Sequence, residues 1–197
     1  MKRAIRHLII GKDTYIESAN EFKQVMLSGH YALIGLVVLV IYSVLDLLQG
    51  TKDTTIVFSI AFLLIASTLV LHRYGQHCLA NYILFPSFNL VVFLIGTSED
   101  LVTGTSIFFL PIALGASAVF NYQQRKIAYA FNAFSFILFS LTLLQGFSIL
   151  PFRNYTPADI HFIQLLTLAT VFPVSFMAIH LLNRLSHYHA GKLIQSN

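Results

Sequence analysis

Histidines are the residues of this sequence best suited to hold a metal ion or a haem, and there are eight of them. A helix that binds a metal usually repeats its ligands three or four residues apart, as in H-x-x-x-H, and the sequence contains no such spacing. The weak candidates for metal ligands are His30, His72, His77 and His180. We therefore expect no metal and no cofactor, and we interpret most histidines as polar anchors near membrane surfaces.

Asp46 is the only carboxylate that falls within a long apolar segment. An ionisable group inside a bilayer is costly and often functional, which would make Asp46 a proton or ion site. Gly50, Lys52 and Asp53 follow closely, however, and indicate the end of the segment. An exposed residue at the membrane rim, in contact with water, is the favoured interpretation.

Neutral amides and prolines also interrupt the apolar segments. The amides are expected to join helices through hydrogen bonds of about 1 kcal/mol each, and together with Asp46 they are the candidates for a ligand or signal site. They are Asn81, Asn89, Asn132, Gln145 and Gln164. Pro86, Pro111 and Pro173 each fall in a different apolar segment, where a proline can act as a hinge or produce a static kink.

Motifs of soluble catalysis are absent from the sequence. There is no phosphate-binding G-x-x-x-x-G-K-[ST], no dinucleotide-binding G-x-G-x-x-G, no G-x-S-x-G nucleophile turn and no H-E-x-x-H zinc motif. No enzymatic reaction can be assigned from these residues.

The composition indicates that lipid surrounds most of the chain. Of 197 residues, 56% are hydrophobic and only 10% are charged, and the mean hydropathy is +0.74. Soluble domains carry roughly 25% charged residues. The single cysteine excludes an internal disulfide. Although the net charge is +4, the basic residues lie between apolar runs rather than together, so nucleic acid is not an expected partner.

The apolar runs predict an all-α bundle of six transmembrane helices, because about 20 helical residues cross a bilayer. The expected spans are His30 to Leu48, Thr54 to Leu71, His77 to Gly96, Thr105 to Tyr122, Ile127 to Ser148 and Ile160 to Asn183. The remaining residues make a cytoplasmic or interfacial segment at 1–29, in which Leu8 and Ile9 would face lipid headgroups, and an exit helix or tail at 184–197.

The charge distribution predicts the orientation of these spans. Ten of the 12 Lys and Arg residues lie in the two termini and the even-numbered connections, which by the positive-inside rule face the cytoplasm. The anchors of this topology are Arg73, Arg125, Lys126 and Arg184. Both termini are therefore expected to be cytoplasmic.

One segment carries a resemblance to a known family. The run from Gly104 to Phe120, GTSIFFLPIALGASAVF, is preceded by Asn89 and followed by Arg125-Lys126, and the chain also contains Ile9-Ile10-Gly11 and ends in LIQSN. This pattern resembles the six-helix N-terminal membrane region of sensor histidine kinases from Bacteroidetes-type bacteria, a region that also precedes cyclases. Gly29 and His30 stand where that family usually has Asn near the first span, and the kinase H-box and ATP-binding lobe are absent.

The resemblance implies a sensory input domain in a bacterial cytoplasmic membrane, a homodimer surrounded by membrane lipids, which relays a stimulus through its last helix to a cytoplasmic effector in cis or in a partner. Two other functions stay open. A small transporter or channel subunit would lose substrate flux in Asp46→Asn. A membrane-embedded redox or lipid enzyme that uses the cytoplasmic-side histidines would contain a metal on analysis.

Overall fold

The computed structural model describes residues 8–11, 18–49, 52–120, 124–144, 148–153 and 155–195. These residues form helices and connections without any strand, which confirms the all-α prediction. The helices are α2 (Ala19–Gln49), α3 (Lys52–Arg73), α4 (His77–Thr97), the short 3-10 turns η1 (Leu101–Thr103) and η2 (Thr105–Phe108), α5 (Phe109–Val119), α6 (Arg125–Leu143) and α7 (Pro157–Gln195).

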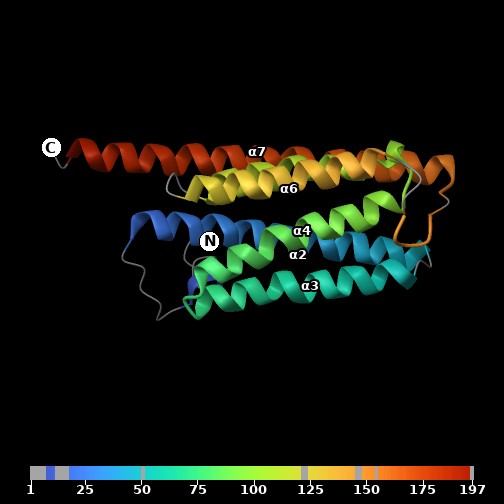
Figure 1. Ribbon diagram of the computed structural model, residues 1–197, viewed down its shortest axis with the longest axis horizontal. Coiled ribbons are helices and arrows are strands. Elements are labelled where there is room, and N and C mark those ends of the chain that lie inside the picture. The colour runs from blue at the N-terminus through green and yellow to red at the C-terminus, as the bar shows by residue number, and fades with distance from the viewer. Residues whose placement is uncertain are drawn as a thin grey trace.

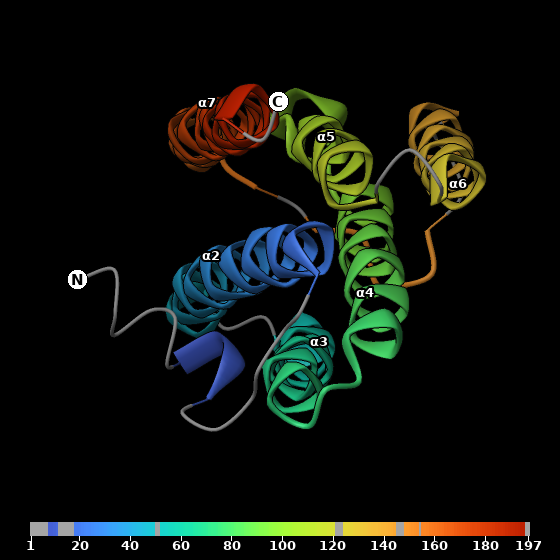
Figure 2. The same cartoon turned by 90° about the vertical axis from the view of Figure 1, so that its left-hand side faces the viewer.

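The long helices run side by side along one axis, each antiparallel to the next in sequence (Figure 1). The connections that follow α2, α4 and α6 lie at one end of the bundle, on the right in Figure 1, and those that follow α3 and α5 lie at the other. Seen along the axis, α3 packs on α2 and α4, whereas α5 contacts α2, α4, α6 and α7 (Figure 2). The last helix, α7, therefore contacts the bundle mainly through α5 and through η1 and η2, the two turns that precede α5.

Among the residues that the structure describes, five helices are long and apolar enough to cross a membrane. These segments are Glu21–Leu48, Thr54–Arg73, His77–Thr97, Arg125–Leu143 and Pro157–His180. Their outer surfaces are apolar: Leu63, Phe136 and Phe176 are each more than 60% exposed. Such a surface would be unfavourable in water and is matched by lipid tails, so the chain is a membrane protein.

The fourth expected span is shorter than the sequence predicts. Gly104 adopts a left-handed conformation with φ of 76° and separates η1 from η2, and Phe120 is extended, which ends α5 at Val119. The apolar helix thus covers only Thr105–Val119, so the number of six spans stays a prediction. The fifth expected span is also shorter, since α6 ends at Leu143 rather than Ser148.

Prolines fall at positions of different consequence. Pro86 lies inside α4 and Pro173 inside α7, and both helices continue through them. Pro111 is the third residue of α5. The turn of η2 runs directly into α5, so Pro111 lies within the apolar helix Thr105–Val119. A hinge or a kink at these three prolines stays a prediction.

The described part of the N-terminal segment packs on the bundle. Residues 8–10 are helical, and Ile9 and Ile10 are almost fully buried against α2 and Leu69 of α3. The carbonyl oxygen of Leu8 accepts a hydrogen bond from Arg73 Nε at 2.9 Å. Gly29 of α2 leaves the space that the Ile9 side chain occupies. Ile9 therefore faces protein, in contrast to the prediction that it faces lipid headgroups.

Candidate functional site

Two connections and the last turn of α2, at one end of the bundle, bring together four polar side chains from segments far apart in sequence. Asp46 lies in the last turn of α2, Glu99 follows the end of α4, and Arg153 and Tyr155 lie just before α7. We call these four residues the charge cluster. Because α2, α4 and the connection before α7 all reach the same end, the four side chains of the charge cluster can meet there.

Arg153 is the centre of the charge cluster. Its Nη2 donates to Asp46 Oδ2 at 2.6 Å and its Nη1 to Asp46 Oδ1 at 3.1 Å, which is the two-pronged geometry that guanidinium and carboxylate groups favour. Nη1 also approaches Glu99 Oε1 at 2.8 Å and the Tyr155 hydroxyl oxygen at 2.7 Å. One guanidinium group therefore bridges α2, the α4–α5 connection and the segment that leads into α7.

Glu99 is held by hydroxyl groups as well as by Arg153. The Tyr155 hydroxyl donates to its Oε1 at 2.9 Å, and Thr103 and Thr105 donate to its Oε2 at 3.1 and 2.7 Å. The backbone supports this arrangement, since the N–H of Arg153 donates to the carbonyl oxygen of Ser98 at 2.8 Å. The two connections are thus tied by both side chains and backbone.

The charge cluster is buried and carries one cation for two carboxylates. Asp46, Glu99 and Arg153 are 3%, 7% and 8% exposed. Burial alone would lower the pKa of Arg153, but the charge of Glu99 and the hydrogen bond to Tyr155 outweigh it, so the pKa lies above its usual value. Burial, and then the charge of Glu99, raise the pKa of Tyr155. Arg153 therefore stays charged and Tyr155 keeps its proton.

Sequence reasoning found one member of this cluster and misjudged its surroundings. Asp46 was expected at a rim in contact with water, but it is buried and paired with Arg153. Glu99, Arg153 and Tyr155 were not expected to form a site. The sequence did contain one indication of this site: Arg153 is one of only two basic residues on the side of the membrane where the predicted connections are mostly acidic.

The amides occupy several different environments. Asn132 of α6 donates to Ser117 Oγ of α5 at 2.8 Å and joins two helices as expected. Asn89 instead donates to the carbonyl oxygen of Phe85 in its own helix, so the prediction of a bond between helices is wrong for this donor. Asn81 is buried, Gln164 is half-buried in α7, and Gln145 lies outside the described residues. The hydrogen bonds described for Asn89 and Asn132 do not reach the charge cluster.

Two of the described histidines, His72 and His77, lie together as a pair. The rings of His72 and His77 stack with centroids 5.5 Å apart, and His72 Nε2 lies 2.8 Å from Ser28 Oγ. His30 contacts the carbonyl oxygen of Met26 within its own helix, and His180 is exposed. Among the described residues there is no group of three or more His, Cys, Asp or Glu that could hold a metal ion.

The predicted topology anchors lie away from the charge cluster where the structure describes them. Arg73 ends α3, and Arg125 and Lys126 begin α6, at the end of the bundle opposite the cluster (Figure 1). Arg184 belongs to the helix backbone of α7, and its side chain is outside the described part of the structure.

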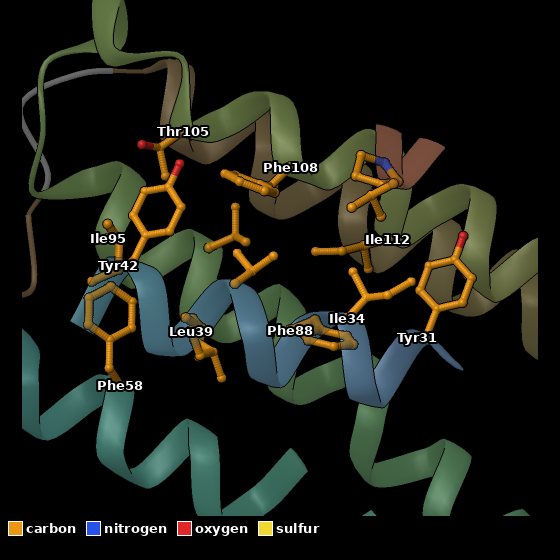
Figure 3. Close-up of a pocket in the computed structure, with 16 residues that line it drawn as sticks. Tyr31, Ile34, Leu39, Tyr42, Phe58, Phe88, Ile95, Thr105, Phe108 and Ile112 are labelled. Carbon is orange, nitrogen blue, oxygen red and sulfur yellow. The ribbon is translucent and has the colours of Figure 1, made fainter. Parts of the chain in front are cut away.

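Figure 3 shows the residues that line an apolar cavity of about 100 Å³, which shares Thr105 with the surroundings of the charge cluster. It is lined by α2, α4 and η2, with single contributions from α3 and α7 and two residues of α5, and none of its lining residues is charged. Thr105 lines the cavity and also donates to Glu99. Tyr42 lines it as well, and its hydroxyl lies 3.0 Å from Thr167 Oγ1 of α7. The cavity and the charge cluster are therefore adjacent parts of one site.

No protein-family model, curated protein or solved structure matches this chain.

Proposed function

We propose that this chain is a membrane-embedded sensory domain, of the kind that precedes sensor histidine kinases, and that it passes a stimulus to a cytoplasmic effector through α7. In this proposal the chain crosses a bacterial cytoplasmic membrane six times, with α5 and its preceding turn as the short fourth span. Both termini are cytoplasmic and the domain forms a homodimer. The basic residues Arg73, Arg125 and Lys126 at one end of the bundle, and the acidic charge cluster at the other, support this orientation.

The observation that carries the proposal is the course of α7. Arg153 and Tyr155, which lie just before the first residue of α7, belong to the charge cluster. Within α7, Thr167 contacts Tyr42, and Val174 lines the cavity. The helix continues for 39 residues to Gln195. At about 1.5 Å per residue this is roughly 58 Å, about twice the thickness of a hydrocarbon core.

This geometry supports a simple relay. A buried ion cluster has few alternative arrangements, because separating one partner leaves a charge without compensation. A stimulus that changes the partners of Arg153 or fills the cavity would favour one arrangement over another, and α7 would follow through its first residues. The end of α7 beyond the bilayer would then move relative to the membrane, where an effector can respond.

The test is a fusion of residues 1–197 to a histidine kinase effector, measured as autophosphorylation in isolated membranes. Arg153→Gln is expected to change the basal activity, and Lys126→Gln removes a charge from the opposite end as a matched control. In a Cys78→Ser background, a bifunctional thiol reagent that joins Tyr42→Cys to Thr167→Cys should cross-link α2 to α7 and remove the effect of Arg153→Gln; a reagent is needed because the long Tyr42 side chain makes the native contact, which leaves the two cysteines too far apart for a direct disulfide. An effector activity that is unchanged by both Arg153→Gln and the cross-link, in protein shown to be folded, would refute the relay.

A further inference from the structure

We infer that the apolar cavity beside the charge cluster binds one neutral hydrocarbon chain, which enters from the bilayer between α2 and α7. The inference assigns a chemical class of ligand to this cavity. That the ligand is also the stimulus rests on the proposed function, whereas its binding does not.

The size of the cavity limits the ligand to a narrow chain. An apolar cavity of about 150 Å³ holds one benzene molecule, and this cavity has a volume of about 100 Å³. A sterol, a haem or a diacyl lipid as a whole is therefore too large to be enclosed. One alkyl or isoprenoid chain fits, with the rest of the molecule outside the cavity.

The lining of the cavity selects an apolar and uncharged occupant. Phe88, Leu39 and Ile112 are typical of its walls, and none of the lining residues is charged. Water is disfavoured there, because a buried water needs two to four polar partners. A carboxylate is disfavoured too, since burial without a cation is costly and the nearby charge cluster already contains two carboxylates, of Asp46 and Glu99.

The cavity is open toward the lipid. Ile34, Val38 and Val174 line it and are only half-buried, whereas Phe58 and Leu39 on its inner side are buried. The residues beside this opening belong to the apolar outer surface. A hydrocarbon chain can therefore pass from the bilayer into the cavity without crossing a polar surface.

The polar atoms of the lining do not face the cavity. Tyr31 lines the cavity and is 6% exposed, but its hydroxyl is inaccessible even to water. The ring of Tyr31 closes one end of the cavity and packs against Gly115 of α5, which leaves no room for a side chain there (Figure 3). The described lining therefore offers its occupant apolar surface and no hydrogen bond.

The experiment uses a tryptophan as a reporter, because the chain contains none. Phe108→Trp places the only tryptophan in the cavity wall, and the protein in phosphatidylcholine vesicles is titrated with 9,10-dibromostearyl alcohol, which quenches it on contact. We expect quenching that saturates. Val38→Phe should fill the cavity and leave only the linear quenching of a lipid-exposed tryptophan. Val37→Phe adds the same ring to the adjacent residue, which is 60% exposed, and should saturate as before.

Further arms test the polarity and the charge of the ligand. Oxygen-free dibromooctadecane should bind as tightly as the alcohol, because the lining donates no hydrogen bond to the ligand, and the dibromostearate anion should bind more weakly than the alcohol. Equal affinity for the anion would show that the selection of an uncharged chain is wrong. Equal quenching in Val37→Phe and Val38→Phe would overturn the site. If Val38→Phe fails to fold by circular dichroism, Ile112→Phe and its exposed control Leu110→Phe replace the pair.

Binding and relay are separable in this design. Saturable quenching of the chain alone, combined with a kinase fusion whose activity does not respond to the alcohol, would support the cavity and contradict its role as the sensory site. If the fusion shows no saturable quenching but its activity still changes in Arg153→Gln, the inferred ligand is wrong and the proposed relay stands.

Discussion

Replacing Arg153 by glutamine should be among the most destabilising single changes in this chain. The substitution removes the cation and keeps a side chain of related shape, so Asp46 and Glu99 are left as two carboxylates in a buried environment. Each of them loses its charged partner at once. The structure predicts that the cost is electrostatic rather than a matter of packing.

The magnitude follows from the buried pairs. Breaking a buried ion pair by removing one partner costs about 3–5 kcal/mol of the free energy of unfolding. Asp46→Asn instead leaves Arg153 paired with Glu99 and relieves the surplus of negative charge, so we expect a loss below about 2 kcal/mol. In a chain of this size 1 kcal/mol corresponds to roughly 2–4 °C in the melting temperature. Arg153→Gln should thus lower the melting temperature by about 6–20 °C.

Thermal unfolding in detergent micelles, followed by circular dichroism, measures these differences. The double variant Arg153→Gln/Asp46→Asn should be more stable than Arg153→Gln alone, because one of the two buried negative charges is removed. Lys126→Gln, at an exposed position, should change the melting temperature little. The reasoning fails if Arg153→Gln is no less stable than Asp46→Asn, or if the double variant shows no recovery.

Three further predictions concern other contacts. Burial and a neighbouring carboxylate raise the pKa of Tyr155, so the folded chain keeps this phenol proton above pH 10, where an unfolded tyrosine loses it. The free energy of unfolding should therefore fall as the pH rises from 9 to 11. The melting temperature of Tyr155→Phe should fall less over the same pH range. Gly29→Ala places a methyl group against the Ile9 side chain and should cost about 1–3 kcal/mol, with faster hydrogen exchange at residues 8–10; unchanged exchange would contradict this. Asn132→Ala should cost about 1 kcal/mol, and a double-mutant cycle with Ser117→Ala should show coupling, whereas strict additivity would deny the bond.

The helices were predictable because a lipid-facing helix needs an apolar surface along its length. The starts at Thr54 and His77 and the end near Leu48 follow from the composition of the runs, and the structure places α2, α3 and α4 over them. The run from Thr105 to Tyr122 is equally apolar, yet α5 ends at Val119. Hydropathy indicates whether a segment is stable in lipid, but it does not indicate where the helix ends.

The candidate site was largely beyond sequence reasoning for a different reason. Arg153 and Asp46 are 107 residues apart, and no local pattern links them. Taken alone, Asp46 near a helix end and Arg153 in a short connection are each typical of residues in contact with water. Their burial depends on how two connections meet the end of α2 at one end of the bundle, which is a property of the tertiary structure.

The position of Arg153 in the chain has a consequence for biosynthesis. The two carboxylates that it compensates belong to residues 46 and 99, whereas the guanidinium comes from the connection before the last helix. During translation both acids leave the ribosome long before their counter-ion, so this end of the bundle stays incomplete until α7 has begun to emerge. Nascent chains halted before residue 153 should consequently be recognised by membrane quality-control proteases, and the same chains extended far enough for Arg153 to leave the ribosome should escape them.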